Sequence, residues 1–320
     1  MKLEEIGFYT LCDDRVKNQS ASSPLHRCEM ILTSRCNFKC PYCRPLRPEC
    51  RGDLLFARAR ETLALWIDNG LRNVRFSGGE PMMYKGIYQL VKQAQKGNVQ
   101  RIALSTNGSF PLHMYQRMIE LGVNDFSISL DACCASVGEQ MCGGIKCAWN
   151  KVVENIRWLS RLTYVTVGMV LTENNIGQVA DIIRFADGLG VADIRVISAA
   201  QFNKPIEALA SIGDDILNRH PILKYRVENF RSSKSVRGMC AGDCNRCHLV
   251  LDDMAVAGKW HFPCIIYLRE GGGPVGEVGP TMRQQRAEWF ANHDCHADPI
   301  CKNNCLDVCV DFNNKARDLK

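Results

Sequence analysis

Strand-like and helix-like patterns alternate along the chain from residue 29 to about residue 205. Apolar stretches predict strands at 29–33, 73–77, 100–105, 124–130, 164–170 and 193–197. Helical periodicity predicts helices between them at 58–70, 84–96, 112–122, 148–162 and 176–189. Glycines near the ends of four of these segments support the boundaries, because glycine is common after helix C-termini: Gly70, Gly97, Gly122 and Gly190. The alternation predicts an α/β protein built from parallel βα units, and the periodicity permits an open doubly wound sheet as well as a barrel.

Three cysteines follow the first predicted strand closely enough to reach one metal centre. They are Cys36, Cys40 and Cys43, three and two residues apart, after the apolar run at 30–32. Zinc and iron–sulfur clusters are the metal centres that thiolates favour. A closed site takes four protein ligands, so three local thiolates leave one position for a substrate or cofactor. On spacing alone, a metal site and reduced structural cysteines are equal alternatives.

The second predicted strand runs into the turn Gly78-Gly79-Glu80-Pro81. Together, in this order, the cysteine motif and this turn resemble the radical S-adenosylmethionine (SAM) superfamily. The resemblance implies a partial (β/α)6 TIM-type barrel in which Cys36, Cys40 and Cys43 hold a four-iron four-sulfur (4Fe–4S) cluster, with SAM on its fourth iron. It also implies that Tyr42 lies against the adenine, and that the methionyl ammonium is received by Gly78, Gly79 and Glu80. Glycines allow backbone to approach a ligand closely, and a carboxylate pairs well with an ammonium.

Polar residues follow the later strands, at the carboxyl ends where such folds bind ligands. By resemblance, Ser105, Asn107, Ser129 and Asp131 are candidates to bind the ribose and carboxylate of SAM. Turn capping is the alternative for each, because Ser, Asn and Asp favour turns for their own reasons. Further polar residues after the fifth and sixth strands are expected to line the substrate cavity: Thr172, Asn174, Asn175, Ser198 and Gln201.

The chain has 18 cysteines, and they concentrate after residue 239. The N-terminus lacks the apolar segment of a secretory signal, so metal binding explains them better than a disulfide framework. The sequence also predicts a hairpin with cysteines at its ends. Its first strand is expected at 249–253, and its turn and second strand at 258–264. This part resembles the SPASM and twitch extensions of radical SAM enzymes. The resemblance implies at least one auxiliary 4Fe–4S cluster, with ligands drawn from Cys244, Cys247, Cys264, Cys301, Cys305 and Cys309.

Two departures from the extension's pattern limit this prediction to one complete auxiliary cluster. Asn292 stands where a cysteine would precede Cys295-x5-Cys301-x3-Cys305, and Cys309 follows unusually closely. The preferred set is Cys247, Cys264 and Cys305, with the fourth ligand from Cys240, Cys244, Cys301 or Cys309. A separate site at 240–247 and a structural zinc site are the alternatives. Four nearby histidines are expected to be solvated or packed, because enough thiolates are present: His248, His261, His293 and His296.

The remaining cysteines carry weaker signals. The four between residues 132 and 147 match no ligand spacing and are expected to be loop thiols, one of which could face the cavity: Cys133, Cys134, Cys142 and Cys147. Cys12 and Cys28 stand alone and are expected to be small buried residues.

The sequence divides into four predicted parts: a lead-in (1–26), the barrel (27–205), a bridging helix and linker (206–236) and the cysteine-rich extension (237–320). A net charge of +6 allows an anionic partner, but no basic run favours nucleic acid. No apolar stretch approaches the roughly 20 residues that span a bilayer. We therefore expect a cytoplasmic protein without membrane or nucleic-acid partners.

The resemblance implies an enzyme that reductively cleaves SAM, with electrons from a flavodoxin- or ferredoxin-type donor. The 5′-deoxyadenosyl radical then abstracts hydrogen from a small molecule or short peptide. An auxiliary cluster that accepts an electron leads to oxidation or crosslinking, and a thiol that returns hydrogen leads to epimerisation. The alternative is a non-catalytic iron–sulfur or zinc protein, either an electron carrier or a nucleic-acid-binding module. The Gly-Gly-Glu-Pro turn after a strand argues against it, because such proteins have no need of that turn.

Overall fold

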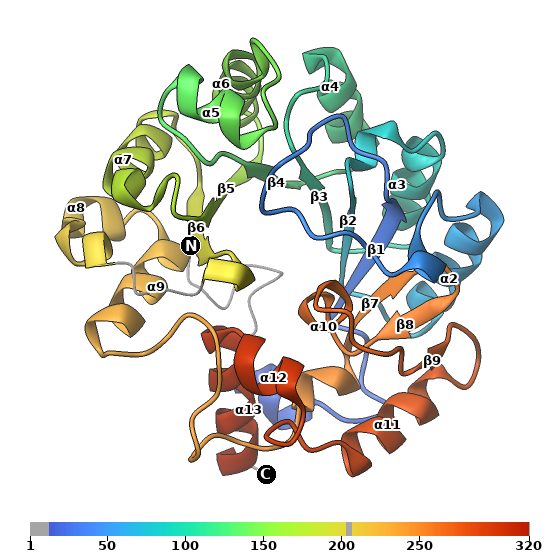
Figure 1. Ribbon diagram of the computed structural model, residues 1–320. Helices are drawn as coiled ribbons and strands as arrows, with labels where there is room; N and C mark the ends of the chain where they lie inside the picture. Colours follow the sequence, from blue (N-terminus) through green and yellow to red (C-terminus); the bar gives the residue numbers. More distant parts are fainter. Residues whose placement is uncertain (1–12, 203–206, 320) are drawn as a thin grey trace. The chain divides into compact units, whose positions relative to one another are not determined.

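The structure is a computed structural model that describes residues 13–202 and 207–319 (Figure 1). The chain forms two compact units, and each is built from separate stretches of sequence. The first unit comprises Met1–Arg35, Arg44–Ile102 and Arg237–Lys320, and the second comprises Cys36–Cys43 and Ala103–Val236. Within the described residues, no helix has both the length and the hydropathy needed to cross a membrane.

Five strands form the sheet of the first unit, in the order β2-β1-β7-β8-β9. β1 (Arg27–Thr33) pairs in parallel with β2 (Asn73–Gly78) on one side and with β7 (Asp253–Ala257) on the other. β7 continues into the antiparallel strand β8 (Trp260–Phe262), which pairs with β9 (Gly276–Glu277). Figure 1 shows this hairpin beside β1. The C-terminal segment therefore extends the sheet that begins with β1.

Helices of the first unit bury apolar faces against this sheet. α2 packs on β1 and on α3, and the indole of Trp66, fully buried in α2, reaches Met254 of β7. α10 packs on β7 and β8, while α13 packs on α1 and η7. The helical elements are α1 (Asp13–Asn18), η2 (Pro48–Cys50), α2 (Phe56–Asp68), η3 (Pro81–Met83), α3 (Ile87–Lys96), η7 (His248–Leu251), α10 (Ile265–Arg269), α11 (Met282–Asn292), α12 (Pro299–Asn304) and α13 (Asp307–Leu319).

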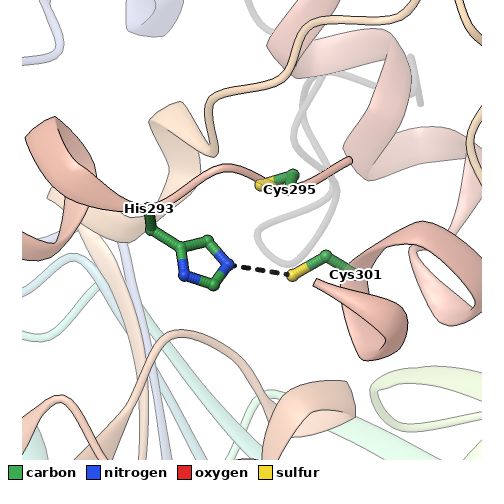
Figure 2. A group of neighbouring side chains, drawn as sticks. All are labelled: His293, Cys295 and Cys301. Atoms are coloured by element: carbon green, nitrogen blue, oxygen red, sulfur yellow. Dashed lines mark hydrogen bonds between the residues drawn. The ribbon is translucent and has the colours of Figure 1, made fainter. Parts of the chain in front are cut away.

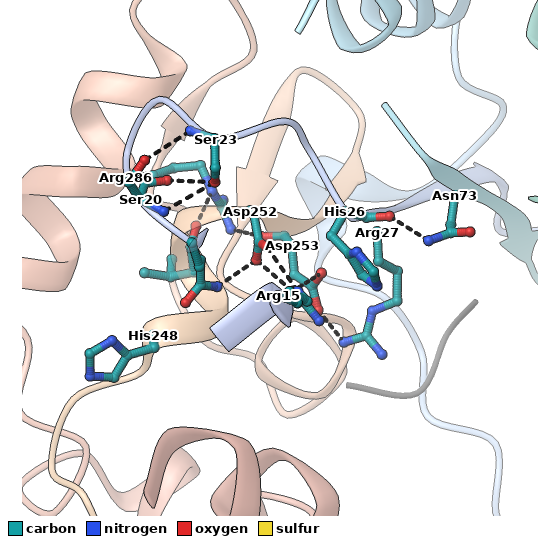
Figure 3. Close-up of polar contacts among 12 residues, drawn as sticks. Arg15, Ser20, Ser23, His26, Arg27, Asn73, His248, Asp252, Asp253 and Arg286 are labelled. Atoms are coloured by element: carbon teal, nitrogen blue, oxygen red, sulfur yellow. Dashed lines mark hydrogen bonds and ion pairs between the residues drawn. The ribbon is translucent and has the colours of Figure 1, made fainter. Parts of the chain in front are cut away.

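A buried network of charges joins α1, β1 and the start of β7 (Figure 3). Arg15 Nη2 lies 2.7 Å from Asp253 Oδ1, and its Nε donates to Asp252 Oδ2 at 2.9 Å. Arg27 Nη2 reaches the other oxygen of Asp253 at 2.6 Å. Arg286 of α11, 1% exposed, donates to the carbonyl oxygens of residues 250, 253 and 262. Because the buried carboxylates face guanidinium groups, the cost of their burial is largely offset.

Four parallel strands form the sheet of the second unit, in the order β6-β5-β4-β3. They are β3 (Arg101–Thr106), which enters this unit at Ala103, β4 (Asp125–Ser129), β5 (Tyr164–Leu171) and β6 (Asp193–Ser198). α6 packs on β5, and α7 and α9 pack on β6. The helical elements are α4 (Leu112–Leu121), α5 (Ala135–Met141), α6 (Ala148–Leu159), η4 (Ile176–Gln178), α7 (Val179–Gly188), η5 (Ala200–Phe202), η6 (Glu207–Ser211), α8 (Asp214–Leu217) and α9 (Pro221–Arg231).

The two faces of this second sheet differ in chemistry. Residues on one face have no exposed surface and pack under the helices: Phe126, Ile128, Val165, Val167, Met169, Ile194 and Val196. Residues on the other face include small and polar side chains and one arginine, namely Ser105, Ser127, Ser129, Gly168 and Arg195, together with the apolar Val170 and Ile197. Such alternation follows from the two-residue period of a strand. The second face therefore carries more short and polar side chains than the first, with Val170 and Ile197 as its apolar members.

The predicted strands and helices of residues 29–205 are confirmed, with boundaries that shift by one to a few residues. The strand predicted at 249–253 is wrong. Residues His248–Leu251 form the 3-10 helix η7, and the hairpin strand begins only at Asp253. Leu249, Val250 and Leu251 are all buried, and Leu249 packs in a cluster with Phe312. A short run of buried apolar residues fits a helical turn as well as a strand, so its pattern could not decide.

The boundaries of the predicted parts and two lone cysteines complete the comparison with the sequence. The four-part division of the sequence stays a prediction. The β1–β7 pairing places residues of the extension in the sheet of the first unit. The bridging segment contains η6, α8 and α9 rather than one helix and a linker. Cys12 lies outside the described residues. Cys28 lies in β1 and is fully buried, as expected for a small structural thiol.

Candidate functional site

The cysteine loop (residues 36–43) belongs to the second unit, where side chains after β3 hold it. Asn37 Nδ2 donates to Ser109 Oγ at 2.8 Å. Asn107 Nδ2 donates to Asn37 Oδ1 at 2.8 Å. Asn107 is 9% exposed and its Oδ1 also accepts the Ser109 N–H, so it is fixed on two sides. Sequence reasoning named Asn107 but missed Asn37 and Ser109, for which local spacing gives no signal.

The three thiols of this loop are presented at its surface. Cys36 and Cys43 are exposed and Cys40 is half-buried. Cys36 Sγ accepts the Phe38 N–H at 3.3 Å and faces Asn107 Nδ2 at 3.8 Å. Burial, and next the Asp131 carboxylate, raises the pKa of Cys40 to about 12, so iron that binds there must displace a proton. N–H groups directed at sulfur stabilise thiolate ligands, and the loop therefore fits an iron–sulfur cluster.

Tyr42 and Asp131, both predicted to bind SAM, contact each other. Tyr42 Oη donates to Asp131 Oδ2 at 2.5 Å, and Asp131 Oδ1 accepts the Val170 N–H at 2.8 Å. Burial raises the pKa of the Asp131 carboxyl to about 6, although the bonds from Tyr42 and Val170 act in the opposite direction. Asp131 thus anchors the cysteine loop to the end of β4. Sequence reasoning did not foresee this contact, because the two residues are far apart in the chain.

The Gly-Gly-Glu-Pro turn lies in the first unit and is bonded to the backbone that precedes the cysteine loop. The Gly79 N–H donates to Thr33 O at 2.7 Å, and the Glu80 N–H donates to Arg35 O at 2.8 Å. A Cβ on Gly79 would lie 2.2 Å from Arg35 O, and one on Gly78 would lie 2.3 Å from Thr33 O. Glu80 is fully buried and its Oε1 accepts the Met82 N–H. The glycines therefore permit a close backbone contact within the protein itself.

The other predicted residues of the second unit divide between the open face of its sheet and its turns. Ser105 is half-buried and Ser129 is exposed on that face. Arg195 Nη2 donates to Ser127 Oγ at 3.3 Å, while among the described residues Arg195 Nε has no hydrogen-bond partner. Gly168 leaves room for this guanidinium, since a Cβ there would lie 3.1 Å from Arg195 Nη2. Arg195 was missed, although its charge within an apolar strand pattern was a usable signal.

The residues after β5 act in a turn. Asn175, 1% exposed, accepts the Thr172 N–H and donates to the carbonyl oxygens of Asp131 and Val170. These bonds give Asn175 a turn-capping role, and the expected lining of the substrate cavity stays a prediction. Asn174 is exposed and Ser198 is 1% exposed. Of Gln201 only the backbone, in η5, belongs to the described structure.

Six C-terminal thiols gather in the first unit. Cys247 is half-buried beside Cys295, Cys264 and Cys309, and desolvation raises its pKa well above the usual value. Cys295 raises the pKa of the Cys301 thiol, and Cys309 raises that of Cys305, so each pair lies close together. Each is a free thiol, as is every cysteine in the described part of the chain. The gathered residues are Cys247, Cys264, Cys295, Cys301, Cys305 and Cys309.

The gathering includes five of the six predicted auxiliary ligands. The sixth, Cys244, is buried with its Sγ against Arg246 O, and its N–H donates to Asn314 Oδ1. Cys295 takes part although it was left out of the predicted set, and its place in the Cys295-x5-Cys301 spacing was the available signal. Cys240 is exposed, with its N–H on Asp243. Cys247 therefore lies with the later thiols rather than in a separate site at 240–247.

All four nearby histidines have packing or hydrogen-bonding contacts, as expected. His261 is fully buried between Gln285 and Arg286, and burial lowers its pKa to about 4. His248 packs against Phe290, and His296 contacts the carbonyl oxygen of residue 243. His293 reaches a thiol, with Nε2 3.7 Å from the Sγ of Cys301.

Comparison with known proteins identifies the fold and its chemistry. The family model described as Radical SAM superfamily matches residues 30–186 of this chain, which include both sequence motifs. This chain belongs to the radical SAM superfamily. Two solved structures share its fold: anSMEcpe with bound AdoMet (TM-score 0.65, 15% identity, covering 92% of this chain and 96% of that one) and Streptococcus suis SuiB (TM-score 0.58, 15% identity, 88% and 67%). The predicted partial (β/α)6 TIM-type barrel with a cysteine-rich C-terminal part is confirmed.

Curated relatives carry a more specific activity in their names. A probable GTP 3′,8-cyclase of Sulfurisphaera tokodaii is 24% identical over 248 residues, which are 70% of this radical SAM chain and 77% of the relative. The GTP 3′,8-cyclase of Nautilia profundicola is 26% identical over 211 residues, 64% of this chain and 65% of the relative. The GTP 3′,8-cyclase of Mesorhizobium japonicum is 28% identical, and the match covers 52% of each chain. The chain therefore spans less than two thirds of the last two relatives.

Family membership confirms the predicted cofactors. A radical SAM enzyme uses SAM and a 4Fe–4S cluster. The gathered C-terminal thiols fit the predicted auxiliary cluster, because four thiolates are the usual ligands of such a cluster. The alternative of a non-catalytic iron–sulfur or zinc protein is not supported. Which residues bind each cofactor stays a prediction.

Proposed function

We propose that this enzyme cleaves SAM at a 4Fe–4S cluster held by Cys36, Cys40 and Cys43 and abstracts hydrogen from a small anionic substrate. The observation that carries this proposal is the cysteine loop, whose polar side chains are fixed to strand ends while Cys36 and Cys43 are exposed. When bound, the reduced cluster supplies one electron to the SAM sulfonium, so that the C5′–S bond breaks into methionine and a 5′-deoxyadenosyl radical. The protein orients the reactants and excludes water.

The residues proposed to hold SAM follow the family pattern. Tyr42, fixed by its bond to Asp131, lies against the adenine. Ser105, Asn107 and Ser129 contact the ribose and carboxylate. In the first unit the methionyl ammonium is received by Gly78, Gly79 and Glu80. The chemistry supports the last assignment, because a carboxylate pairs well with an ammonium.

Arg195 is proposed to bind the anionic group of the substrate. It stands on the open face of the second sheet, with Nε available and with Gly168 beside it instead of a side chain. The guanidinium fork matches carboxylate and phosphate oxygens. Neighbouring serines on the same face are short enough to leave space for a ligand. The net charge of +6 also favours an anion.

The C-terminal thiols are proposed to bind one auxiliary 4Fe–4S cluster through Cys247, Cys264, Cys305 and Cys309. Cys305 hydrogen-bonds to Cys309 and lowers its pKa, and Arg27 acts in the same direction. A guanidinium beside a thiol favours the thiolate form that binds iron. A cluster held by these thiols would supply an acceptor for the electron that the substrate radical gives up. An external one-electron donor of the flavodoxin or ferredoxin type reduces the first cluster.

Among anionic substrates, a purine nucleoside triphosphate is the first candidate, because several relatives carry the name GTP 3′,8-cyclase. A peptide is the second substrate class, since SuiB, which shares the fold, has been solved with the precursor peptide SuiA. Identity near 15% supports the fold only, so the peptide serves here as the contrasting arm of a test.

The test uses anaerobic, iron- and sulfide-reconstituted protein with SAM and dithionite. We expect 5′-deoxyadenosine to form, and to form faster with GTP than with short peptides. Replacing Arg195 with methionine should raise the KM for the triphosphate by about tenfold to a hundredfold, because one charge-assisted hydrogen bond is lost. The KM for SAM should stay unchanged. Arg184→Met, at an exposed helix position, is the matched control. An Arg195→Met variant that instead raises the KM for SAM would reassign the guanidinium to SAM.

A further inference from the structure

Three ligand-type atoms converge next to the proposed auxiliary cluster. His293 Nε2, Cys295 Sγ and Cys301 Sγ all lie within 4.8 Å of one another (Figure 2). Nε2 of His293 and Sγ of Cys301 are 3.7 Å apart. The proposed auxiliary cluster uses none of these residues.

The spacing of these atoms suits a single ion. Zinc binds thiolate at about 2.3 Å and imidazole at about 2.0–2.1 Å with tetrahedral angles, which puts neighbouring ligand atoms about 3.6 Å apart. The separation of 3.7 Å between His293 Nε2 and Cys301 Sγ matches such a tetrahedral edge. The thiolates of a 4Fe–4S cluster each bind a different iron and therefore lie farther apart. Within the described residues, no three of the other gathered thiols meet the compact spacing.

The surrounding residues hold the three ligands in place. The ring of His293 stacks on Trp289 with centroids 3.8 Å apart, and Arg246 donates to its carbonyl oxygen at 2.8 Å. Cys295 is 3% exposed, and its N–H donates to the carbonyl oxygen of residue 245. The Cys301 N–H is capped by Asp298 Oδ1 at 3.1 Å. Ligands fixed in this way lose little further entropy when an ion binds.

One carboxylate oxygen lies close to His293. Asp298 Oδ2 lies 3.5 Å from His293 Nε2 and accepts the hydroxyl of Tyr267 at 2.7 Å. That separation also matches a tetrahedral edge between oxygen and nitrogen ligands of zinc. Asp298 is half-buried, so its charge is partly shielded from water.

We propose that His293, Cys295 and Cys301 bind one zinc ion, with Asp298 beside His293. Two thiolates and an imidazole suit zinc, which needs no redox partner. The ion joins the end of α11 to α12, and it stabilises the segment that carries two of the auxiliary-cluster thiols. This inference does not depend on the proposed reaction or substrate.

The test is metal analysis of the full chain after anaerobic reconstitution with iron and sulfide and supply of zinc. We expect about one zinc per chain in wild type, in addition to cluster iron. His293→Ala and Cys301→Ala should each lose at least about nine tenths of the zinc and keep the iron. His296→Ala, three residues from His293, should keep both metals. Zinc X-ray absorption on wild type should show mixed sulfur and imidazole scattering, a readout that needs no variant.

Several outcomes would overturn the proposal. They are a wild-type protein without bound zinc, a zinc shell of sulfur alone, and a His293→Ala variant that keeps its zinc. Loss of iron rather than zinc from Cys301→Ala would assign this thiol to an iron–sulfur cluster instead. A cobalt(II) titration gives a second check, since a site with two thiolates should produce thiolate-to-cobalt absorption that is absent from His293→Ala.

Discussion

Replacing Gly79 with alanine tests whether the turn after β2 is built for contact with the backbone before the cysteine loop. The new Cβ would lie 2.2 Å from Arg35 O, 2.6 Å from Arg35 C and 2.8 Å from Ser34 O. These are backbone atoms at the end of β1, so no side-chain rotation relieves the clash. To reach ordinary contact distance, one of the two backbone segments must move by about 1 Å.

The cost follows from what that movement breaks. The Glu80 N–H to Arg35 O bond (2.8 Å) is lost, and the Gly79 N–H to Thr33 O bond (2.7 Å) is lengthened. Overpacking costs about 1–3 kcal/mol and each weakened hydrogen bond about 1 kcal/mol. We expect the free energy of unfolding to fall by about 2–4 kcal/mol, which lowers the Tm by several degrees.

Two measurements on the same samples, Tm and SAM-dependent 5′-deoxyadenosine formation, decide the matter. Gly177→Ala is the control, since a Cβ there meets nothing within 4 Å. We expect Gly177→Ala to resemble wild type and Gly79→Ala to lose both stability and product. A Gly79→Ala protein with wild-type Tm and wild-type product formation would refute the packing argument. Normal Tm with lost product would mean that Gly79 serves the ligand alone.

Two further predictions concern titratable groups of the second unit. Burial raises the pKa of the Asp131 carboxyl to about 6, so its contribution to folding is fully present below about pH 4 and is lost, by about 3 kcal/mol, as the pH rises through 6. The free energy of unfolding of Asp131→Asn, minus that of wild type, should therefore rise by roughly 1.5 kcal/mol from pH 5 to pH 8. The measurement is urea unfolding of the reduced, iron-free chain. Parallel pH profiles of the two proteins would disprove this. Hydrogen bonds, first from Ser136, lower the pKa of the Cys134 thiol, while burial raises that of Cys133. Iodoacetamide at neutral pH should alkylate Cys134 several times faster than Cys133, as read by peptide mass spectrometry; equal rates would count against the shifts.

The regular part of the fold could be predicted from the sequence because periodicity reports burial. Strands such as Asp193–Ser198 alternate a helix-covered side with an open side, and the chain switches period where a helix begins. Periodicity failed to predict the structure of residues 249–251, where three consecutive apolar side chains are all buried. In such a run a helical turn and a strand leave the same pattern.

The candidate sites were predictable only where their residues are close in sequence. Their spacing in the sequence identifies Cys36, Cys40 and Cys43 as candidates, and the same holds for Gly78 and Gly79. The partners that fix them do not, because they come from distant strand ends brought together by the fold.

The C-terminal thiols show the same limit. Which of eight cysteines come together depends on how η7, α12 and α13 pack, and no spacing rule carries that information. His293 was expected to pack or be solvated, since thiolates were already sufficient in number. Its position beside Cys301 became visible only when the turn after α11 was placed in space.

The central claim is that Cys36, Cys40 and Cys43 hold the cluster that cleaves SAM, separate from the metal sites of the C-terminal thiols. The most direct measurement is 5′-deoxyadenosine formation and iron content in a variant with all three cysteines replaced by alanine. We predict no 5′-deoxyadenosine above the level without enzyme, a loss of about four iron atoms per chain, and retention of the iron bound by the C-terminal thiols. Undiminished 5′-deoxyadenosine, or the loss of all iron, would contradict the account.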